Sequence, residues 1–106
     1  MEVYKMKKGR IRHMAVFTLK SQYDSAETKK FLADGEKILS SIPVVEHFEV
    51  LKQISNKYDF EFGFSMEFAN QEAYDTYNAH PDHQAFVEER WKKEVKKFQE
   101  IDFEVY

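Results

Sequence analysis

The chain has 106 residues, enough for one domain with a hydrophobic core and too few for a second domain that folds alone. With 42% hydrophobic and 16% aromatic residues, a folded globule is expected, and a net charge of −3 argues against a nucleic-acid partner. The absence of cysteine excludes disulfides, thiolate catalysis and cysteine-based zinc sites. No apolar run approaches the roughly 20 residues that span a bilayer, so no membrane association is expected.

Residues 1–10 are polar and basic, and we interpret them as a solvated lead-in. They lack the apolar segment of a signal peptide, which favours a cytoplasmic location. Residues 11–19 predict the first strand, in which His13 and Phe17 share one face. Two interpretations of His13 stay open. It is either a histidine at the edge of the core that bonds a backbone carbonyl, or a base or hydrogen-bond donor at the floor of a cavity.

Residues 24–42 predict a helix on the surface of the domain. Asp24 is expected to cap it, and Glu27 three residues later completes a capping box. Pro43 is expected to end it. Gly35 lies within the apolar stripe of this helix, which indicates a close approach to another element because glycine lowers helix stability for no local gain.

Two further strands are predicted by the central part of the chain. Residues 44–54 alternate imperfectly, so a bulge or a sheet edge is expected there, with His47 at the surface or in an interface. Residues 60–68 form the clearest alternating pattern, and their apolar face needs a helical layer or a ligand above it. The members of that face are Phe60, Phe62, Phe64, Met66 and Phe68. The opposite face is small and acidic, and it is expected to be solvated in a monomer.

The last third of the chain completes the fold. Asn70 is expected to cap a second helical stretch, which breaks at His80-Pro81 because proline suits the first turn of a new helix. Residues 98–106 predict the last strand. The order β-α-β-β-α-β defines an α+β, ferredoxin-like fold with an antiparallel four-stranded sheet and helices on one face. The other face of the sheet is left open, so we expect a two-fold homodimer.

The stretch 77–83, Tyr-Asn-Ala-His-Pro-Asp-His, joins two helical segments and holds two of the four histidines. Other parts of the chain add to this motif: the pattern Arg-His-x-x-x-Phe-x-Leu-Lys at residues 12–20, the aromatic strand 60–68 and a closing strand with an aspartate and aromatics. Together they resemble the stress-responsive dimeric A/B barrel (Dabb) family over residues 11–106. The resemblance implies a ferredoxin-like protomer whose sheet packs on the sheet of a second protomer. The two sheets then form a barrel with the helices outside.

The resemblance also implies a site. The family includes proteins without a known activity and a plant polyketide cyclase that closes an aromatic ring by aldol condensation, without cofactor or metal. In that enzyme the tyrosine and the second histidine of Tyr-x-x-His-Pro-x-His are the catalytic pair, and Tyr77 and His83 occupy these positions here. Its pocket histidine on the first strand matches His13, whereas Phe62 stands where that enzyme has a further pocket histidine.

These residue types are suited to acid–base chemistry. A neutral histidine takes a proton from a carbon beside a carbonyl near pH 7, and a tyrosine hydroxyl stabilises the developing oxyanion in a dry pocket. In this hypothesis His83 is the base and Tyr77 the donor. The predicted lining of a cavity for a small hydrophobic ligand is His13, His80, Phe17, Phe62 and Phe64. The structural alternative is that His80 caps the helix, His83 bonds the sheet and Tyr77 fills the core.

Four functions therefore stay open. The first is a homodimeric Dabb protein with a small-molecule cavity and no catalysis. The second is a cofactor-independent enzyme, such as an aldol-type cyclase, a lyase or a monooxygenase-like protein. Neither the first nor the second function requires a cofactor or a metal. The third is a zinc site formed by His13, His80 and His83. The fourth is a stress-protective assembly larger than a dimer.

Overall fold

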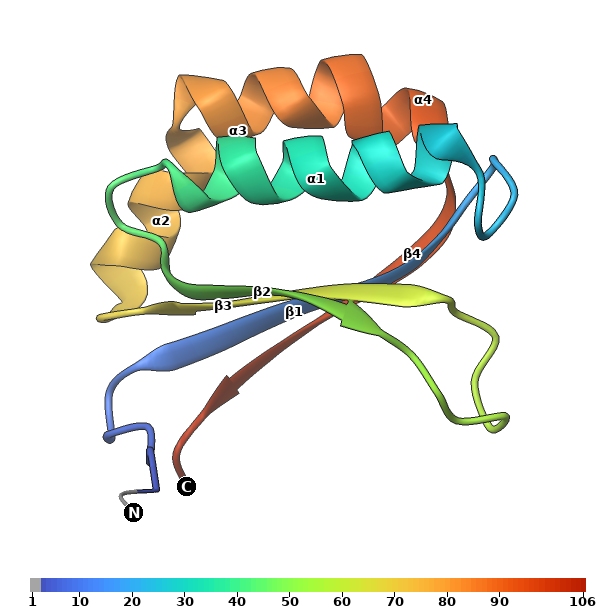
Figure 1. The fold of residues 1–106 in the computed structure, drawn as a ribbon. Coiled ribbons are helices and arrows are strands. Elements are labelled where there is room, and N and C mark those ends of the chain that lie inside the picture. Colours follow the sequence, from blue (N-terminus) through green and yellow to red (C-terminus); the bar gives the residue numbers. More distant parts are fainter. Residues whose placement is uncertain (1–2) are drawn as a thin grey trace.

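The computed structural model describes residues 3–106, which form a four-stranded antiparallel sheet in the order β2-β3-β1-β4. The elements are β1 Ile11–Leu19, α1 Ala26–Ser40, β2 Glu46–Lys52, β3 Phe62–Phe68, α2 Gln71–Ala79, α3 Pro81–Phe86, the π-helical turn η1 Val87–Trp91, α4 Lys92–Glu94 and β4 Val95–Glu104. Helix α1 and the run from α3 to α4 lie over one face of the sheet (Figure 1). This arrangement confirms the predicted α+β, ferredoxin-like fold.

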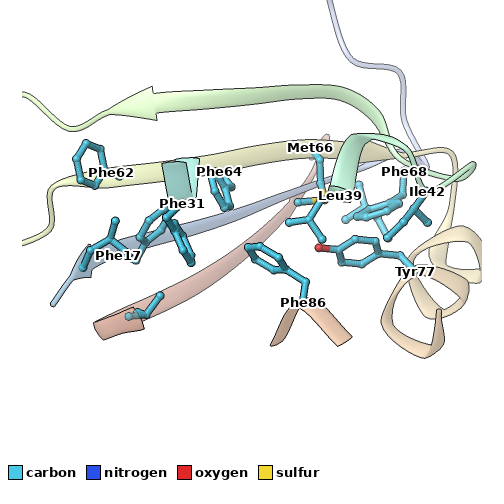
Figure 2. Packing of buried hydrophobic residues seen from close by; sticks show 13 residues of the cluster. Phe17, Phe31, Leu39, Ile42, Phe62, Phe64, Met66, Phe68, Tyr77 and Phe86 are labelled. Carbon is cyan, nitrogen blue, oxygen red and sulfur yellow. The ribbon is translucent and has the colours of Figure 1, made fainter. Parts of the chain in front are cut away.

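The hydrophobic core fills the space between the sheet and these helices (Figure 2). Strand β1 has the predicted bounds, and its residues alternate between buried and half-buried. The apolar face of β3 is buried under the helices, as its pattern predicted. Each phenylalanine side chain that is removed from water in this way stabilises the fold by about 1.5–3 kcal/mol.

Gly35 confirms the predicted close approach of α1 to another element, which is the sheet. A Cβ atom at this position would lie 2.7 Å from the ring of Phe64 and 3.3 Å from the ring of Phe86. A side chain here would therefore push α1 away from β3 and α3. The missing Cβ lets the helix sit close to the aromatic core, which offsets the lower helix propensity of glycine.

Some element boundaries differ from the predictions. Ser25 rather than Asp24 caps α1, and its hydroxyl accepts a hydrogen bond from the backbone N–H of Thr28. The last strand begins at Val95 rather than at residue 98, because Val95 pairs with Leu19 of β1. Strand pairing across the sheet overrides the helical spacing of Val95.

Strand β2 is shorter than predicted, but its irregularity is confirmed. The register with β3 shifts between Glu46 and Glu49, and His47 between them has a positive φ of 53°. His47 is exposed, as expected, and its ring lies 5.1 Å from the ring of Tyr4. A bulge of this kind twists the sheet edge locally.

The helix-free face of the sheet is defined here as the face formed by alternate residues Arg12 to Thr18 of β1, Gly63 to Glu67 of β3 and Gln99 to Phe103 of β4. The expectation that the β3 part of this face is solvated in a monomer is wrong. Ser65 and Glu67 are 5% and 3% exposed within a single chain. The neighbouring strands and the N-terminal segment cover them.

Glu67 is covered by side chains from the segment that was interpreted as a solvated lead-in. Its Oε1 accepts hydrogen bonds from the Tyr4 hydroxyl at 2.5 Å and from Arg10 Nε at 3.4 Å, and Arg12 donates to Oε2 at 3.4 Å. Most other residues of the segment 3–10 are exposed, as expected. The lead-in is thus fixed to the sheet at two points.

None of the helices in residues 3–106 has the length and the hydropathy that crossing a bilayer requires.

Candidate functional site

A cavity of about 300 Å³ lies between the helical layer and the side of the sheet that carries β1, β3 and β4. Such a volume is at the lower end of the range for small-molecule sites, about 300–1,000 Å³. Most of the wall is apolar and partly aromatic. The lining residues are His13, Ala15, Leu39, Phe64, Met66, Tyr77, Asn78, His83, Phe86, Val87, Trp91, Phe98 and Glu100.

The break between α2 and α3 brings Tyr77 and His83 to the same wall. Pro81 occupies the first turn of α3, and the His80 ring accepts a hydrogen bond from the backbone N–H of Asp82 at 3.1 Å. This cap turns the chain between the two helices. The Tyr77 and His83 rings consequently lie 4.3 Å apart, measured between their centroids.

His83 is held as a neutral base. Its Nδ1 lies 3.3 Å from the carbonyl oxygen of Asn78, so the N–H at this position donates and the Nε2 lone pair stays available. Burial lowers the pKa of the His83 imidazole, more strongly than the hydrogen bond to the Asn78 carbonyl raises it. The ring is therefore uncharged at neutral pH and able to accept a proton.

Tyr77 is held as a hydrogen-bond donor. Its side chain is 3% exposed and lies beside Phe68, with 5.1 Å between the ring centroids. Figure 2 shows its hydroxyl oxygen pointing away from α2 toward the middle of the core. Burial raises the pKa of the Tyr77 hydroxyl, and the negative charge of Glu100 adds to the effect. The hydroxyl keeps its proton and can donate a hydrogen bond to an oxygen in the cavity.

A second polar cluster surrounds His13 at the floor of the cavity. His13 Nδ1 lies 2.6 Å from Asp102 Oδ1, and the Tyr74 hydroxyl lies 3.0 Å from Asp102 Oδ2. Because a carboxylate only accepts, Nδ1 of His13 carries the hydrogen of this bond and the tyrosine hydroxyl donates to the other oxygen. In a ring with a single N–H the lone pair then lies on Nε2, which is 3.7 Å from Glu100 Oε1.

Tyr74 keeps its proton in this cluster. Burial raises the pKa of its hydroxyl, and the hydrogen bond to Asp102 raises it further. Asp102 therefore receives two donors and fixes the orientation of the His13 ring. The arrangement presents one imidazole nitrogen of His13 to the cavity as an acceptor.

The structure brings together four of the predicted site residues and separates three. His13, Phe64, Tyr77 and His83 line the cavity. The other three lie elsewhere. Phe17 is fully buried against Phe31 and Trp91, Phe62 stacks on Tyr23, and His80 caps α3.

The alternative in which His80, His83 and Tyr77 have only structural roles is confirmed in part. His80 does cap the helix, but His83 bonds the Asn78 carbonyl rather than the sheet. Sequence reasoning missed Tyr74, Glu100 and Asp102. Two signals could have found them: Tyr74 precedes Tyr77 by three residues on one helix face, and Asp102 has the strand parity that pairs it with His13.

The three histidines considered for zinc do not converge. Within residues 3–106, no group of three histidine or acidic side chains is arranged to hold a metal ion.

The family assignment comes from comparison of the sequence with family models. The model of the stress responsive A/B barrel domain, Dabb, matches residues 11–105. This chain therefore belongs to the Dabb family, as the first strand, the aromatic strand, the motif of residues 77–83 and the closing strand together predicted. Comparison with curated proteins finds no match.

Solved structures agree with this assignment. A Dabb family protein with a ferredoxin-like fold from Mesorhizobium loti is 60% identical, with a TM-score of 0.92 over 93% of this chain and 99% of that chain. A dimeric ferredoxin-like protein of unknown function from Thermobifida fusca is 16% identical, with a TM-score of 0.76 over 99% of both chains. The hydroxynitrile lyase of Passiflora edulis is 13% identical, with a TM-score of 0.78 over 94% of this chain and 96% of that chain. The last two likenesses concern the fold alone.

Proposed function

We propose that this Dabb protein is a homodimer in which the cavity of each protomer binds a small, largely apolar molecule with one polar end. The domain spans residues 11–106, and the segment 1–10 precedes it as a lead-in. The observation that carries the proposal is the cavity itself, whose apolar wall is interrupted by His13, Tyr77 and His83. An apolar cavity with a few convergent polar groups is the usual form of a small-molecule site.

The dimer is proposed on the helix-free face of the sheet. Apolar side chains of this face stay partly exposed in the single chain, Val16 in the centre and Ile101 and Phe103 toward the edge, the last two 49% and 52% exposed. A contiguous exposed apolar surface is typical of an interface. The Thermobifida fusca protein of the same fold is described as dimeric, which is consistent with this arrangement.

The polar groups define how a ligand would be held. Tyr77 donates one hydrogen bond, and His13 and His83 each offer one accepting nitrogen. The aromatic rings of Phe64, Phe86 and Trp91 would contact the apolar body of the ligand. A molecule with a carbonyl or hydroxyl group on a short hydrocarbon or single aromatic ring matches this pattern.

Filling the cavity tests the binding proposal without touching its polar groups. Ala15 lines the cavity from β1, so A15L places three further carbon atoms inside it. A panel of small ketones, phenols and aromatic amides is screened against the wild type by ligand-observed NMR. Compounds that bind should lose at least about tenfold in affinity in A15L, because the larger side chain takes space that they need.

The matched control is V3L, which enlarges an exposed residue of the N-terminal segment. It should bind like the wild type, and thermal unfolding should show that A15L is folded. Equal binding to A15L and the wild type would place the ligands elsewhere and contradict the proposal.

A second candidate is a cofactor-independent enzyme that moves a proton on the bound molecule. The specific observation is the contact between a neutral His83 and a protonated Tyr77. His83 would remove a proton from the carbon beside a carbonyl, while Tyr77 would donate a hydrogen bond to the enolate oxygen. The likeness in fold to a hydroxynitrile lyase, at 13% identity, is consistent with such a role and carries little weight alone.

Exchange of hydrogen for deuterium tests this chemistry without knowledge of the product. Ketones that bind are incubated with the protein in D2O, and loss of the signal of the hydrogens beside the carbonyl is followed by NMR. H83Q and Y77F should each slow the exchange by about a hundredfold, because each removes one of the two groups that act on the transition state. Unchanged exchange in both variants would leave a binding protein only.

A further inference from the structure

The wall of the cavity carries a negative charge, and its described residues supply no positive charge to balance it. Thirteen residues line it, and none of those in the described range 3–106 is a lysine or an arginine. Glu100 on β4 is the acidic member of the wall, and its carboxylate is 58% exposed. A ligand that carries a carboxylate would therefore meet a negative charge and no fixed cation to pair with it.

The histidines do not compensate for this charge. Burial lowers the pKa of His83, so its ring is neutral at pH 7. His13 bonds Asp102 through Nδ1, and its Nε2 lies 3.7 Å from Glu100. His13 is thus flanked by a carboxylate at each ring nitrogen and supplies no unpaired positive charge to the wall.

The apolar wall acts in the same direction. Five aromatic rings line the cavity, and an aromatic face carries partial negative charge that attracts cations and repels anions. Removing a carboxylate from water into such a site is unfavourable unless hydrogen bonds or a cation replace the water. The donors of the wall, such as the Tyr77 hydroxyl and the Asn78 amide, are uncharged and do not neutralise a carboxylate.

We propose that Glu100 makes this cavity selective for uncharged molecules with one hydrogen-bonding end, and that it discriminates against carboxylates of the same shape. The ligand class is that of small aldehydes, ketones, phenols and amides rather than acids. This inference rests on the proposed binding function and specifies its ligand.

Two probes of equal shape and different charge test the proposal. Trifluoromethyl-benzamide and the corresponding benzoate differ in the replacement of an amide by a carboxylate, and fluorine NMR measures the affinity of each at low salt. The wild type should bind the amide more tightly. E100Q should raise the affinity for the benzoate about fivefold and leave the amide unchanged, because one unit charge a few ångströms away at a solvated site has an effect of this size.

The control is E104Q, which removes the same charge from the same face of β4 outside the cavity. It should change neither affinity by more than about twofold, since exposed charges at a distance are screened. The A15L variant shows whether both probes occupy the cavity.

Each outcome separates the inference from the binding proposal. If both probes bind the wild type equally, or if E100Q and E104Q behave alike while A15L still blocks binding, the charge selectivity is overturned and the binding function stands. If neither probe binds the wild type, the binding proposal and this inference fall together.

Discussion

Two buried polar side chains lie on opposite faces of the two central strands. His13 of β1, 4% exposed, lies on the helix-covered face, and Glu67 of β3, 3% exposed, lies on the helix-free face. Both oxygens of Glu67 accept bonds, from Tyr4, Arg10 and Arg12. His13 bonds through Nδ1 and leaves Nε2 at the cavity.

The clusters around Glu67 and His13 differ in whether they leave a hydrogen-bonding group free, and this difference distinguishes a structural role from a functional one. Burial favours the neutral acid of Glu67, but the hydrogen bonds from Tyr4 and Arg12 outweigh it and hold the pKa of this carboxyl below its usual range. Such a saturated network has no free group to offer a ligand. The cluster at His13 keeps one acceptor free beside an apolar cavity, so it is the one suited to chemistry.

The largest expected effect concerns the helix-free face as an interface. Val16 lies at the centre of this face, and in a two-fold dimer V16E would place two like charges in one apolar contact. This arrangement costs several kcal/mol, so the variant should be monomeric in light scattering. The wild type and the control A26E, at an exposed position of the helical layer, should both be dimers.

An assembly larger than a dimer in the wild type would favour the stress-protective oligomer. A wild-type monomer would contradict the proposed homodimer.

The next largest effect concerns the stability that Glu67 and its hydrogen-bond partners contribute on the same face. E67Q keeps the shape of the side chain but removes its charge, so the free energy of unfolding should fall by about 1–3 kcal/mol. Denaturant unfolding at pH 7 measures it. E49Q, a change on the exposed side of β2, should be within about 0.5 kcal/mol of the wild type.

The pH dependence sharpens this prediction. The pKa of the Glu67 carboxyl is lowered by folding, so the stabilisation is present above the ordinary glutamate pKa and is lost as the pH falls through the folded value. The gap between E67Q and the wild type should close toward acid pH. A gap that stays constant would mean that charge at Glu67 contributes nothing.

A change at Asp102 should affect the cavity more than the fold. D102N presents an amide to His13, which frees Nδ1 from its carboxylate and allows the proton to move to Nε2. The accepting nitrogen at the cavity is then lost. Ligand affinity should fall about tenfold, while the free energy of unfolding changes by less than about 1 kcal/mol because Asp102 is half-exposed.

Nitrogen NMR of the histidine rings gives a direct check on this prediction, because it distinguishes the two tautomers of His13. D24N, at an exposed position of the loop before α1, is the matched control and should keep the Nδ1–H tautomer. The same tautomer in D102N would contradict the assigned role of Asp102.

The smallest effect is the titration of His83. Because burial lowers the pKa of its ring, proton NMR should show His83 titrating below the ordinary histidine value of about 6.5. The unfolded chain then binds more protons between the two values, so the free energy of unfolding decreases as the pH falls through this window. H83Q should remove this part of the pH dependence. Titration at or above the ordinary value would contradict a neutral base at pH 7.

Local patterns predicted much of the fold. The alternation of residues 11–19 gave the bounds of β1, and the caps at Asn70 and His80-Pro81 placed α2 and the start of α3. These features depend on residues a few positions apart, whose backbone preferences and hydrogen bonds act in any context. Tyr77 and His83 were expected as a pair from the family resemblance alone, and the structure shows that the turn between the two helices brings their rings together.

Contacts between residues far apart in the sequence decided the parts of the structure that local patterns did not predict. The bond between His13 and Asp102 joins residues 89 positions apart, and it depends on the register of β4 against β1. The burial of Glu67 depends on Tyr4 and Arg10 folding back over the sheet. No local pattern encodes these contacts, because they form only when distant segments pack.

The sequence by itself thus determined the order of elements and the family. Only the tertiary structure decided which predicted residues line the cavity, and that Glu100 gives its wall a negative charge. The physical reason is that periodicity assigns a residue to a face of its element, whereas the position along that face and the neighbours across it follow from strand register and packing.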